Sequence, residues 1–260
     1  MSGPVGAKAI MGIDPGFRTG CKLAVVDQTG RYKQSATIYP TLPQQHRESA
    51  EKTVVELLNR YDVAFIAIGN GTASKETMQF IKQVLETHTL DVVPVIVNEA
   101  GASVYSASEV AIEEYPDLDV TIRGAISIAH RLQDPLSELV KIDPKSIGVG
   151  QYQHDVNQTQ LKDALTFTTE SAVNTVGADL NTASAALLSY VAGIGKTLSK
   201  NIIQYRNENG PFGDRKTLLK VPKLGPKSFQ QCAGFLRIKS AKNILDNSAI
   251  HPESYALVKK

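Results

Sequence analysis

The chain has 260 residues, 42% hydrophobic and 21% charged, an ordinary globular composition that is long enough for one large or two small domains. Its short apolar runs exclude a transmembrane helix, and its N-terminus lacks the basic-then-apolar layout of a signal peptide. The two cysteines, Cys21 and Cys232, exclude a disulfide framework or a four-cysteine zinc site, so we expect a cytoplasmic protein without membrane contact.

Residues 1–149 begin with strands and continue with alternating helices and strands. Strands are expected at residues 8–14, 20–27, 31–39, 63–68 and 92–97, and helices at 44–60, 74–86, 103–114 and 122–132. The continuous apolar runs Val63–Ile68 and Val92–Val97 favour strands that are buried on both faces. Because an antiparallel part precedes parallel β-α-β units, the order predicts an α/β domain with a mixed sheet.

The pattern changes after Lys141, where prolines and glycines punctuate a connection through Asp143-Pro144 and Gly148-Val149-Gly150. From about residue 158 onward the sequence shows no strand candidate, only helices separated by Gly and Pro. We therefore place a domain boundary near residue 150 and expect an all-α domain over residues 150–242.

The net charge of +2 argues against a nucleic-acid partner when the whole chain is considered, but the two halves of the chain have opposite net charges. Residues 1–149 hold 14 basic and 18 acidic residues, a net of −4, whereas residues 150–260 hold 14 and 8, a net of +6. Residues 193–242 alone reach +9. Such a block indicates a nucleic-acid-binding surface, although a solvated basic face without a partner explains it equally well.

An internal repeat lies within this basic block. The segments VAGIGK (191–196) and VPKLGPK (221–227) place Gly195 and Gly225 30 residues apart, each after an apolar residue and shortly before a lysine. Each copy predicts a short helix, a glycine hairpin and a second helix. Glycines let a backbone approach a ligand closely, and the following helix offers unpaired N–H groups to an anion. Two copies can hold two phosphates without reading bases.

These segments resemble the tandem helix–hairpin–helix motifs of DNA-uptake receptors. The resemblance assigns nucleic-acid binding to the hairpins, with supporting charge on nearby basic side chains. The candidate residues are Gly193, Gly195, Lys196, Lys200, Arg215, Lys216, Lys220, Lys223, Gly225 and Lys227. In the second copy Lys223 replaces the first glycine, so that hairpin can alternatively serve only to pack helices together.

An aspartate closes the first expected strand in Met11-Gly-Ile-Asp14-Pro-Gly16. The first half resembles the YqgF domain, the Holliday-junction-resolvase-like branch of the RNase H-like fold. In that fold the position of Asp14 is the first ligand of catalytic divalent metal, and the resemblance makes Glu99 the second. Two Mg²⁺ ions held by carboxylates would align a water with the scissile phosphate.

The remaining acids of that pattern are missing. The fourth strand ends in Gly69-Asn70-Gly71, and Arg123 stands where the last helix should supply an aspartate, while Asp117 and Asp119 precede that helix. So few carboxylates make a poor Mg²⁺ site. The histidines show no metal-binding spacing either. Because both kinds of ligand are lacking, we expect no catalytic residues, no metal and no cofactor. The alternative is a Mg²⁺-dependent resolvase-like nuclease that uses Asp14, Glu99 and an unidentified third acid.

Longer blocks are similar to the Tex family of bacterial transcription accessory proteins. They include DPGFRTGCK (14–22), NEAGASVYSAS (98–108), DPKSIGVGQYQHDV (143–156) and DNSAIHPES (246–254). The resemblance implies a central fragment of a longer chain, in which residues 243–260 begin a further domain. It also implies nucleic-acid binding, of RNA or DNA, without strong sequence preference, a link to the transcription machinery, and an inactive resolvase-like domain.

Overall fold

The computed structural model describes residues 5–41 and 45–258. The chain forms two compact units, Met1–Pro135 and Leu136–Lys260. The first carries a mixed sheet and the second consists almost entirely of helices, so the predicted fold class is confirmed. No helix in the described ranges is long and apolar enough to cross a membrane.

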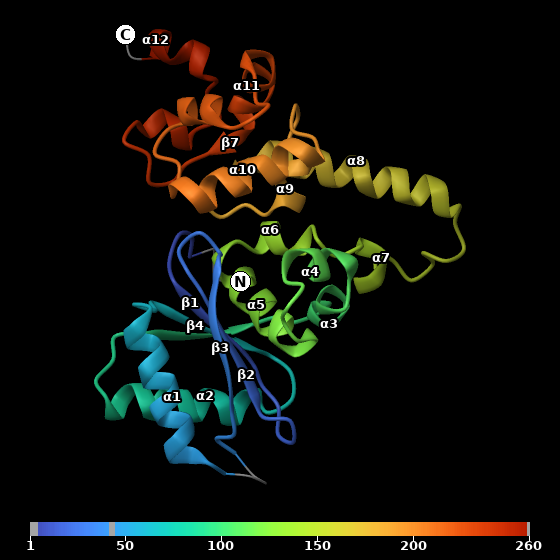
Figure 1. The fold of residues 1–260 in the computed structure, drawn as a ribbon. Helices are drawn as coiled ribbons and strands as arrows, with labels where there is room; N and C mark the ends of the chain where they lie inside the picture. Colours follow the sequence, from blue (N-terminus) through green and yellow to red (C-terminus); the bar gives the residue numbers. More distant parts are fainter. Residues whose placement is uncertain (1–4, 42–44, 259–260) are drawn as a thin grey trace. The chain divides into compact units, whose positions relative to one another are not determined.

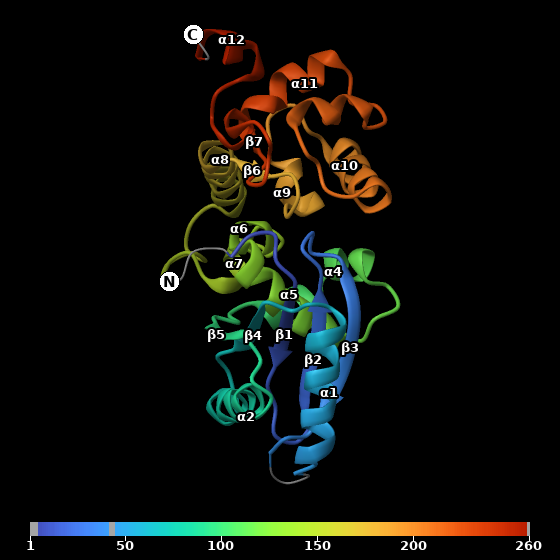
Figure 2. The same ribbon diagram turned by 90° about the vertical axis from the view of Figure 1, so that its left-hand side faces the viewer.

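The first unit is built on a five-stranded sheet with the order β3-β2-β1-β4-β5 (Figures 1 and 2). The central strand β1 (Ile10–Asp14) runs antiparallel to β2 (Cys21–Val26) and parallel to β4 (Phe65–Gly69). The edges are β3 (Tyr32–Ile38) and β5 (Val93–Val97), and β5 is parallel to β4. Because β1, β4 and β5 are parallel, their carboxyl ends lie side by side at the same end of the sheet.

Helices cover both faces of this sheet because successive strand residues point to opposite sides. On one face, α1 (Arg47–Arg60) and α2 (Ser74–Thr87) pack on side chains such as Met11 and Ile13. On the other face, α5 (Val120–Gln133) lies directly on β1. A Cβ added to Gly12 would lie 2.0 Å from the carbonyl oxygen of Ala125, so only glycine lets the helix come so close.

Three details of this unit differ from the sequence prediction. Strand β5 was expected to be buried, but it is an edge strand, and Val93 and Ile96 are 49% and 46% exposed. The helix expected at 103–114 divides into α3 (Ala102–Ser106) and α4 (Glu109–Glu114), because the Ser108 hydroxyl caps the second piece. The helix expected from Gln44 begins at Arg47, and Gln44 lies outside the described residues.

The second unit is assembled from short helices around a core that includes Leu188, Ile202, Leu218 and Cys232. A two-residue parallel ladder joins β6 (Ala178–Asp179) to β7 (Leu236–Arg237), which the sequence did not predict because two residues leave no alternation to detect. The helices are α6 (Pro135–Leu139), α7 (Pro144–Ile147), α8 (Gln158–Val176), α9 (Ala185–Ser189), α10 (Lys196–Asn209), α11 (Pro226–Cys232) and α12 (Tyr255–Val258), with 3-10 helices η1 (Arg215–Lys220), η2 (Ala233–Phe235), η3 (Ile244–Asn247) and η4 (Pro252–Ser254).

The two units part between Pro135 and Leu136, ahead of the boundary expected near residue 150. Leu136 packs against the core of the second unit, and the hydroxyl of Ser137 accepts a hydrogen bond from the backbone N–H of Ser184 at 2.6 Å. The composition shift at residue 150 therefore marks a loop inside the second unit. The change of unit falls at Asp134-Pro135, where a proline disfavours helical backbone at the residue before it.

Candidate nucleic-acid interface

The two hairpins of the second unit have the same backbone geometry. In the first, α9 and α10 flank a loop in which the N–H of Val191 bonds to Leu188 at 3.0 Å and that of Ile194 to Val191 at 3.0 Å. In the second, between η1 and α11, the matching bonds join Val221 to Leu218 at 2.9 Å and Leu224 to Val221 at 3.1 Å. The residues of each matching bond are 30 positions apart in the chain, so the repeat seen in the sequence is a structural repeat.

The apex of each loop adopts a left-handed backbone. Gly193 has φ 81° in the first hairpin, and Lys223 has φ 67° at the matching position of the second. A non-glycine residue in this region costs about 1–2 kcal/mol, because its Cβ crowds the following carbonyl. The second loop therefore keeps the shape of the first although it lacks the glycine, and it carries an additional positive charge at its apex.

The two hairpins also pack against each other. The side-chain amide of Asn201 on α10 donates to the carbonyl of Pro222 in the second loop at 2.8 Å. At the position 30 residues later, Gln231 on α11 packs on the first loop, where its Cβ would lie 2.7 Å from a Cβ added to Gly193. Glycine at position 193 is therefore required by both its backbone angle and its neighbour.

Helix α8 fixes the first loop from another side. The side chain of Asn174 accepts a hydrogen bond from the N–H of Ala192 at 3.1 Å and donates to the carbonyl of Tyr190 at 3.0 Å. The matching residue of Ala192 in the second loop is Pro222, which has no N–H to satisfy. Asn174 was not singled out from the sequence, since its contact crosses 18 residues and follows no motif.

Glycine at positions 195 and 225 is required neither by the backbone angles nor by contacts among the described residues. Each precedes the second helix of its hairpin, with extended backbone angles of φ −89°, ψ 175° and φ −86°, ψ 174° that any residue adopts. A Cβ added at either position would meet no atom of the described residues within 4 Å. Neither backbone strain nor internal packing demands glycine there, so the open space is available to a ligand that approaches the loop.

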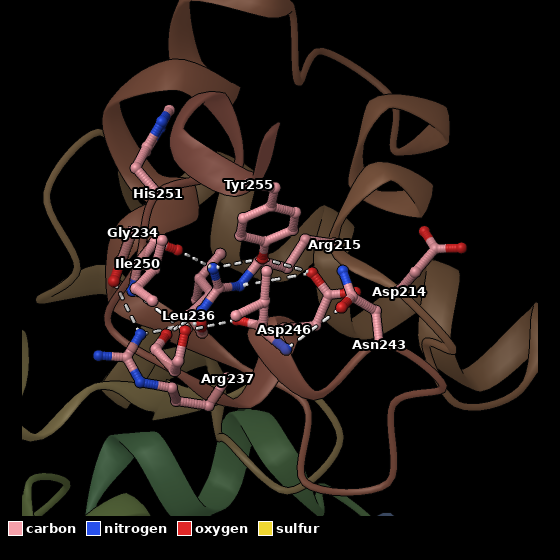
Figure 3. A network of polar contacts seen from close by, with 12 residues as sticks. Asp214, Arg215, Gly234, Leu236, Arg237, Asn243, Asp246, Ile250, His251 and Tyr255 are labelled. Carbon is pink, nitrogen blue, oxygen red and sulfur yellow. Dashed lines mark hydrogen bonds and ion pairs between the residues drawn. The ribbon is translucent and has the colours of Figure 1, made fainter. Parts of the chain in front are cut away.

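The lysines predicted to support binding surround these two loops. Lys196, Lys200, Lys216, Lys220, Lys223 and Lys227 are all exposed. Arg215 differs from this prediction, because its side chain is only 1% exposed and its guanidinium is held by groups of the same unit (Figure 3). The structure therefore brings the lysines and glycines of the hairpins together and leaves Arg215 out of the surface.

The two predicted acids of the first unit do meet at the carboxyl edge of the sheet. Glu99 follows β5, and its carboxylate reaches back over the end of β4, where its Oε2 lies 2.2 Å from a Cβ added to Gly69. Burial and the charge of Glu99 raise the pKa of Asp14 to about 6, with Lys22 opposing this rise. The Oε2 atom of Glu99 is buried and has no hydrogen-bond partner among the described residues.

The residues at the start of α5 do not add a third carboxylate to this pair. Arg123 donates to the carbonyl of Tyr115 at 3.1 Å and to that of Ser106 at 3.4 Å. Asp119 caps α5 by accepting from the N–H of Thr121 at 2.8 Å. No group of three or more His, Cys, Asp or Glu side chains within residues 5–41 and 45–258 could hold a metal ion. Two carboxylates beside a lysine do not fit a two-metal centre.

Three family models match the chain in succession. The Tex protein YqgF-like domain covers residues 8–133, a helix–hairpin–helix motif covers residues 173–237, and a second helix–hairpin–helix domain covers residues 243–260. The second match spans both hairpins. The first ends two residues before the point where the compact units part.

Relatives named Tex align with essentially the whole chain. Protein tex of Bordetella pertussis is 56% identical over 100% of this chain and 33% of its own length. The transcriptional accessory protein Tex of Neisseria gonorrhoeae is 53% identical over 100% of this chain and 34% of its own. The human S1 RNA-binding domain-containing protein 1 is 49% identical over 92% of this chain and 24% of its own length. The chain thus spans about a third of the length of the Tex proteins.

Proposed function

Because the chain belongs to the Tex family, as its YqgF-like domain, its helix–hairpin–helix segments and its sequence identity with Tex proteins show, we propose that it binds nucleic acid. Its second unit binds the sugar–phosphate backbone of RNA or DNA without strong preference for base sequence. Gly193, Gly195, Lys196 and Lys200 act in the first hairpin, and Lys216, Lys220, Lys223, Gly225 and Lys227 act in the second.

The observation that carries this proposal is the open space at Gly195 and Gly225. A phosphate oxygen needs to come within about 3 Å of a backbone N–H, and a side chain at either glycine would stand in its way. The lysine beside Gly195, and the one two residues beyond Gly225, add charge to each position. Because phosphates and sugars lie along every nucleic acid, such contacts position the chain without selecting a base sequence.

The test is a salt titration of binding to single-stranded RNA, single-stranded DNA and duplex DNA of unrelated sequences. Each phosphate contact steepens the decline of log K with log salt, adding about 0.7 to the slope for single strands and about 0.9 for duplex DNA. We expect a steep slope and similar affinities across sequences. A flat response, or an affinity that depends strongly on base sequence, would refute backbone gripping.

For the first unit we propose a role without catalysis. The donor set supports this, because Arg123 and Gly124 stand where a third acid is needed and Lys22 adds a positive charge beside Asp14. In this proposal the unit needs no metal and no cofactor. It then serves as a scaffold or as a surface for a partner.

One observation favours the alternative, a metal-dependent nuclease. A buried carboxylate oxygen without a donor, as at Glu99, is costly unless a proton or a cation meets it. Cleavage of branched and single-stranded substrates with Mg²⁺ or Mn²⁺ separates the two roles. Metal-dependent cutting that is lost in Asp14→Asn would overturn the non-catalytic assignment, and the absence of cutting in both proteins supports it.

We further propose that the chain acts in the cytoplasm together with the transcription machinery, as the name of the Neisseria relative suggests. The support is the relationship alone, because the chain spans about a third of that protein. Purified RNA polymerase added to the chain on nucleic acid should form a larger complex. A polymerase that binds equally well to nucleic acid without the chain, and forms no joint complex, would remove this part of the proposal.

A further inference from the structure

Arg215 is a charged side chain of the hairpin unit that is only 1% exposed, although its neighbours in sequence are exposed. One terminal nitrogen, Nη1, donates to the carbonyl of Ile250 at 2.7 Å and to the hydroxyl of Tyr255 at 2.9 Å, and Nη2 donates to the carbonyl of Ser248 (Figure 3). All three acceptors belong to the segment 243–258. A planar guanidinium suits such a site because its donors are held in a fixed fork.

An acidic partner completes this cluster. The carboxylate of Asp246 is buried at 4% exposure, and its Oδ1 lies 4.0 Å from Nε of Arg215. The hydroxyl of Tyr255 donates to the same oxygen at 2.7 Å, so Tyr255 accepts from the arginine and donates to the aspartate (Figure 3). Breaking a buried pair of this kind is destabilising because it leaves one charge without compensation.

The same segment is also attached to the other helix of the second hairpin. The side-chain amide of Gln230 on α11 donates to the carboxylate of Glu253 at 2.6 Å, and the backbone carbonyl oxygen of Gln230 lies 3.0 Å from Nε2 of His251. Arg215 is the first residue of η1, whereas Gln230 lies on α11. Segment 243–258 therefore spans from the first helix of the hairpin to the second.

The second hairpin has particular need of this support. Its first helix is a six-residue 3-10 helix and its second has seven residues, compared with the 14 residues of α10 in the first hairpin. The first loop is additionally held by Asn174, and the second carries a strained lysine, Lys223, at its apex.

We propose that Arg215 is a positioning residue for nucleic-acid binding, which holds the second hairpin in its binding conformation by tying segment 243–258 across its two helices. This inference rests on the proposed function and gives it a further part. Segment 243–258 then works as a component of the second hairpin. Arg215 contributes through this segment and makes no contact with phosphate.

The substitution Arg215→Lys tests this role, because it keeps the positive charge but cannot reach the three acceptors together. The adjacent exposed residue provides the matched control, Lys216→Ala. Hydrogen exchange of the free protein should become faster in residues 215–232 and 243–258 of Arg215→Lys, with α10 unchanged. Binding should weaken at least about tenfold, because two linked contact sites give an affinity far above that of one. Lys216→Ala should leave exchange unchanged, and its affinity and salt slope should fall by no more than one phosphate contact contributes.

Wild-type exchange or wild-type affinity in Arg215→Lys would overturn the proposal, and so would faster exchange spread evenly over α10 as well. If this variant does not fold, Tyr255→Phe removes only the hydroxyl, and the same pattern at smaller amplitude is expected. The exchange measurement contains no nucleic acid. A wild-type protein that binds none therefore refutes the proposed function, while the positioning of the hairpin remains measurable by itself.

Discussion

A serine in place of Gly195 should abolish one phosphate contact without harming the fold. The backbone there has φ −89° and ψ 175°, close to that of Ser184, which has φ −78° and ψ 163° and caps α9 by accepting from the N–H of Leu187 at 3.1 Å. A serine at 195 should cap α10 in the same way. Serine exceeds glycine as a cap by a few tenths of a kcal/mol, so the free energy of unfolding should stay equal or rise slightly.

Binding should change in the opposite direction. The new hydroxyl fills space that is open in the described structure and occupies N–H groups that a phosphate would use. A hydrogen bond to a charged group contributes about 1.5–3 kcal/mol, so affinity should fall about ten- to a hundredfold. The salt slope should fall by about 0.7–0.9, as expected for one lost phosphate.

The assay pairs fluorescence anisotropy at several salt concentrations with urea denaturation of the same preparations. Gly213→Ser is the matched control, since a Cβ there also meets no atom of the described chain within 4 Å, but the residue lies between the hairpins. We expect wild-type affinity for Gly213→Ser. Wild-type affinity for Gly195→Ser, or a loss that follows a loss of stability, would show that the open glycine does not mark a phosphate site.

Three other substitutions test separate parts of the structure. Because the pKa of Asp14 is raised from 3.8 to about 6, the fold loses stability as pH rises from about 3.8 to about 6. Asp14→Asn should therefore add about 1–2 kcal/mol at pH 7.5, after allowance for partial exposure, and nothing at pH 4, as measured by urea denaturation. Lys223→Gly should raise stability by about 0.5–1 kcal/mol by removing left-handed strain, yet weaken binding in low salt. Gly193→Ala should lower the melting temperature through a loss of about 1–3 kcal/mol; an unchanged melting temperature would contradict the packing described for that loop.

Local pattern was sufficient for most of the fold and for the hairpins. Strand β4 was recognised as a central strand because its apolar run is continuous, and the repeat was visible because backbone turns depend on glycines at fixed offsets. The same reasoning misjudged β5, since an apolar run does not reveal whether another strand follows it in the sheet. Its position depends on contacts across the chain rather than on its own residues.

In the candidate site, too, some features follow from the local sequence and others depend on contacts between distant residues. The lysines of the hairpins lie at the surface, but Arg215 was counted with them because a charge tally ignores burial. Its partner Asp246 is 31 residues away, and no short motif links them. Asp14 and Glu99 were found through family resemblance, whereas the depth at which they meet needed the packing of α5 against β1.

The hydrogen bonds of Arg123 limit which side chains position 123 can accept. Its guanidinium is the partner of two backbone carbonyls, those of Tyr115 and Ser106, so the side chain has become part of the local architecture. A change to aspartate would lose charged hydrogen bonds of about 1.5–3 kcal/mol each and would leave both carbonyls in need of new donors. An acid at this position therefore requires compensating changes elsewhere in the unit.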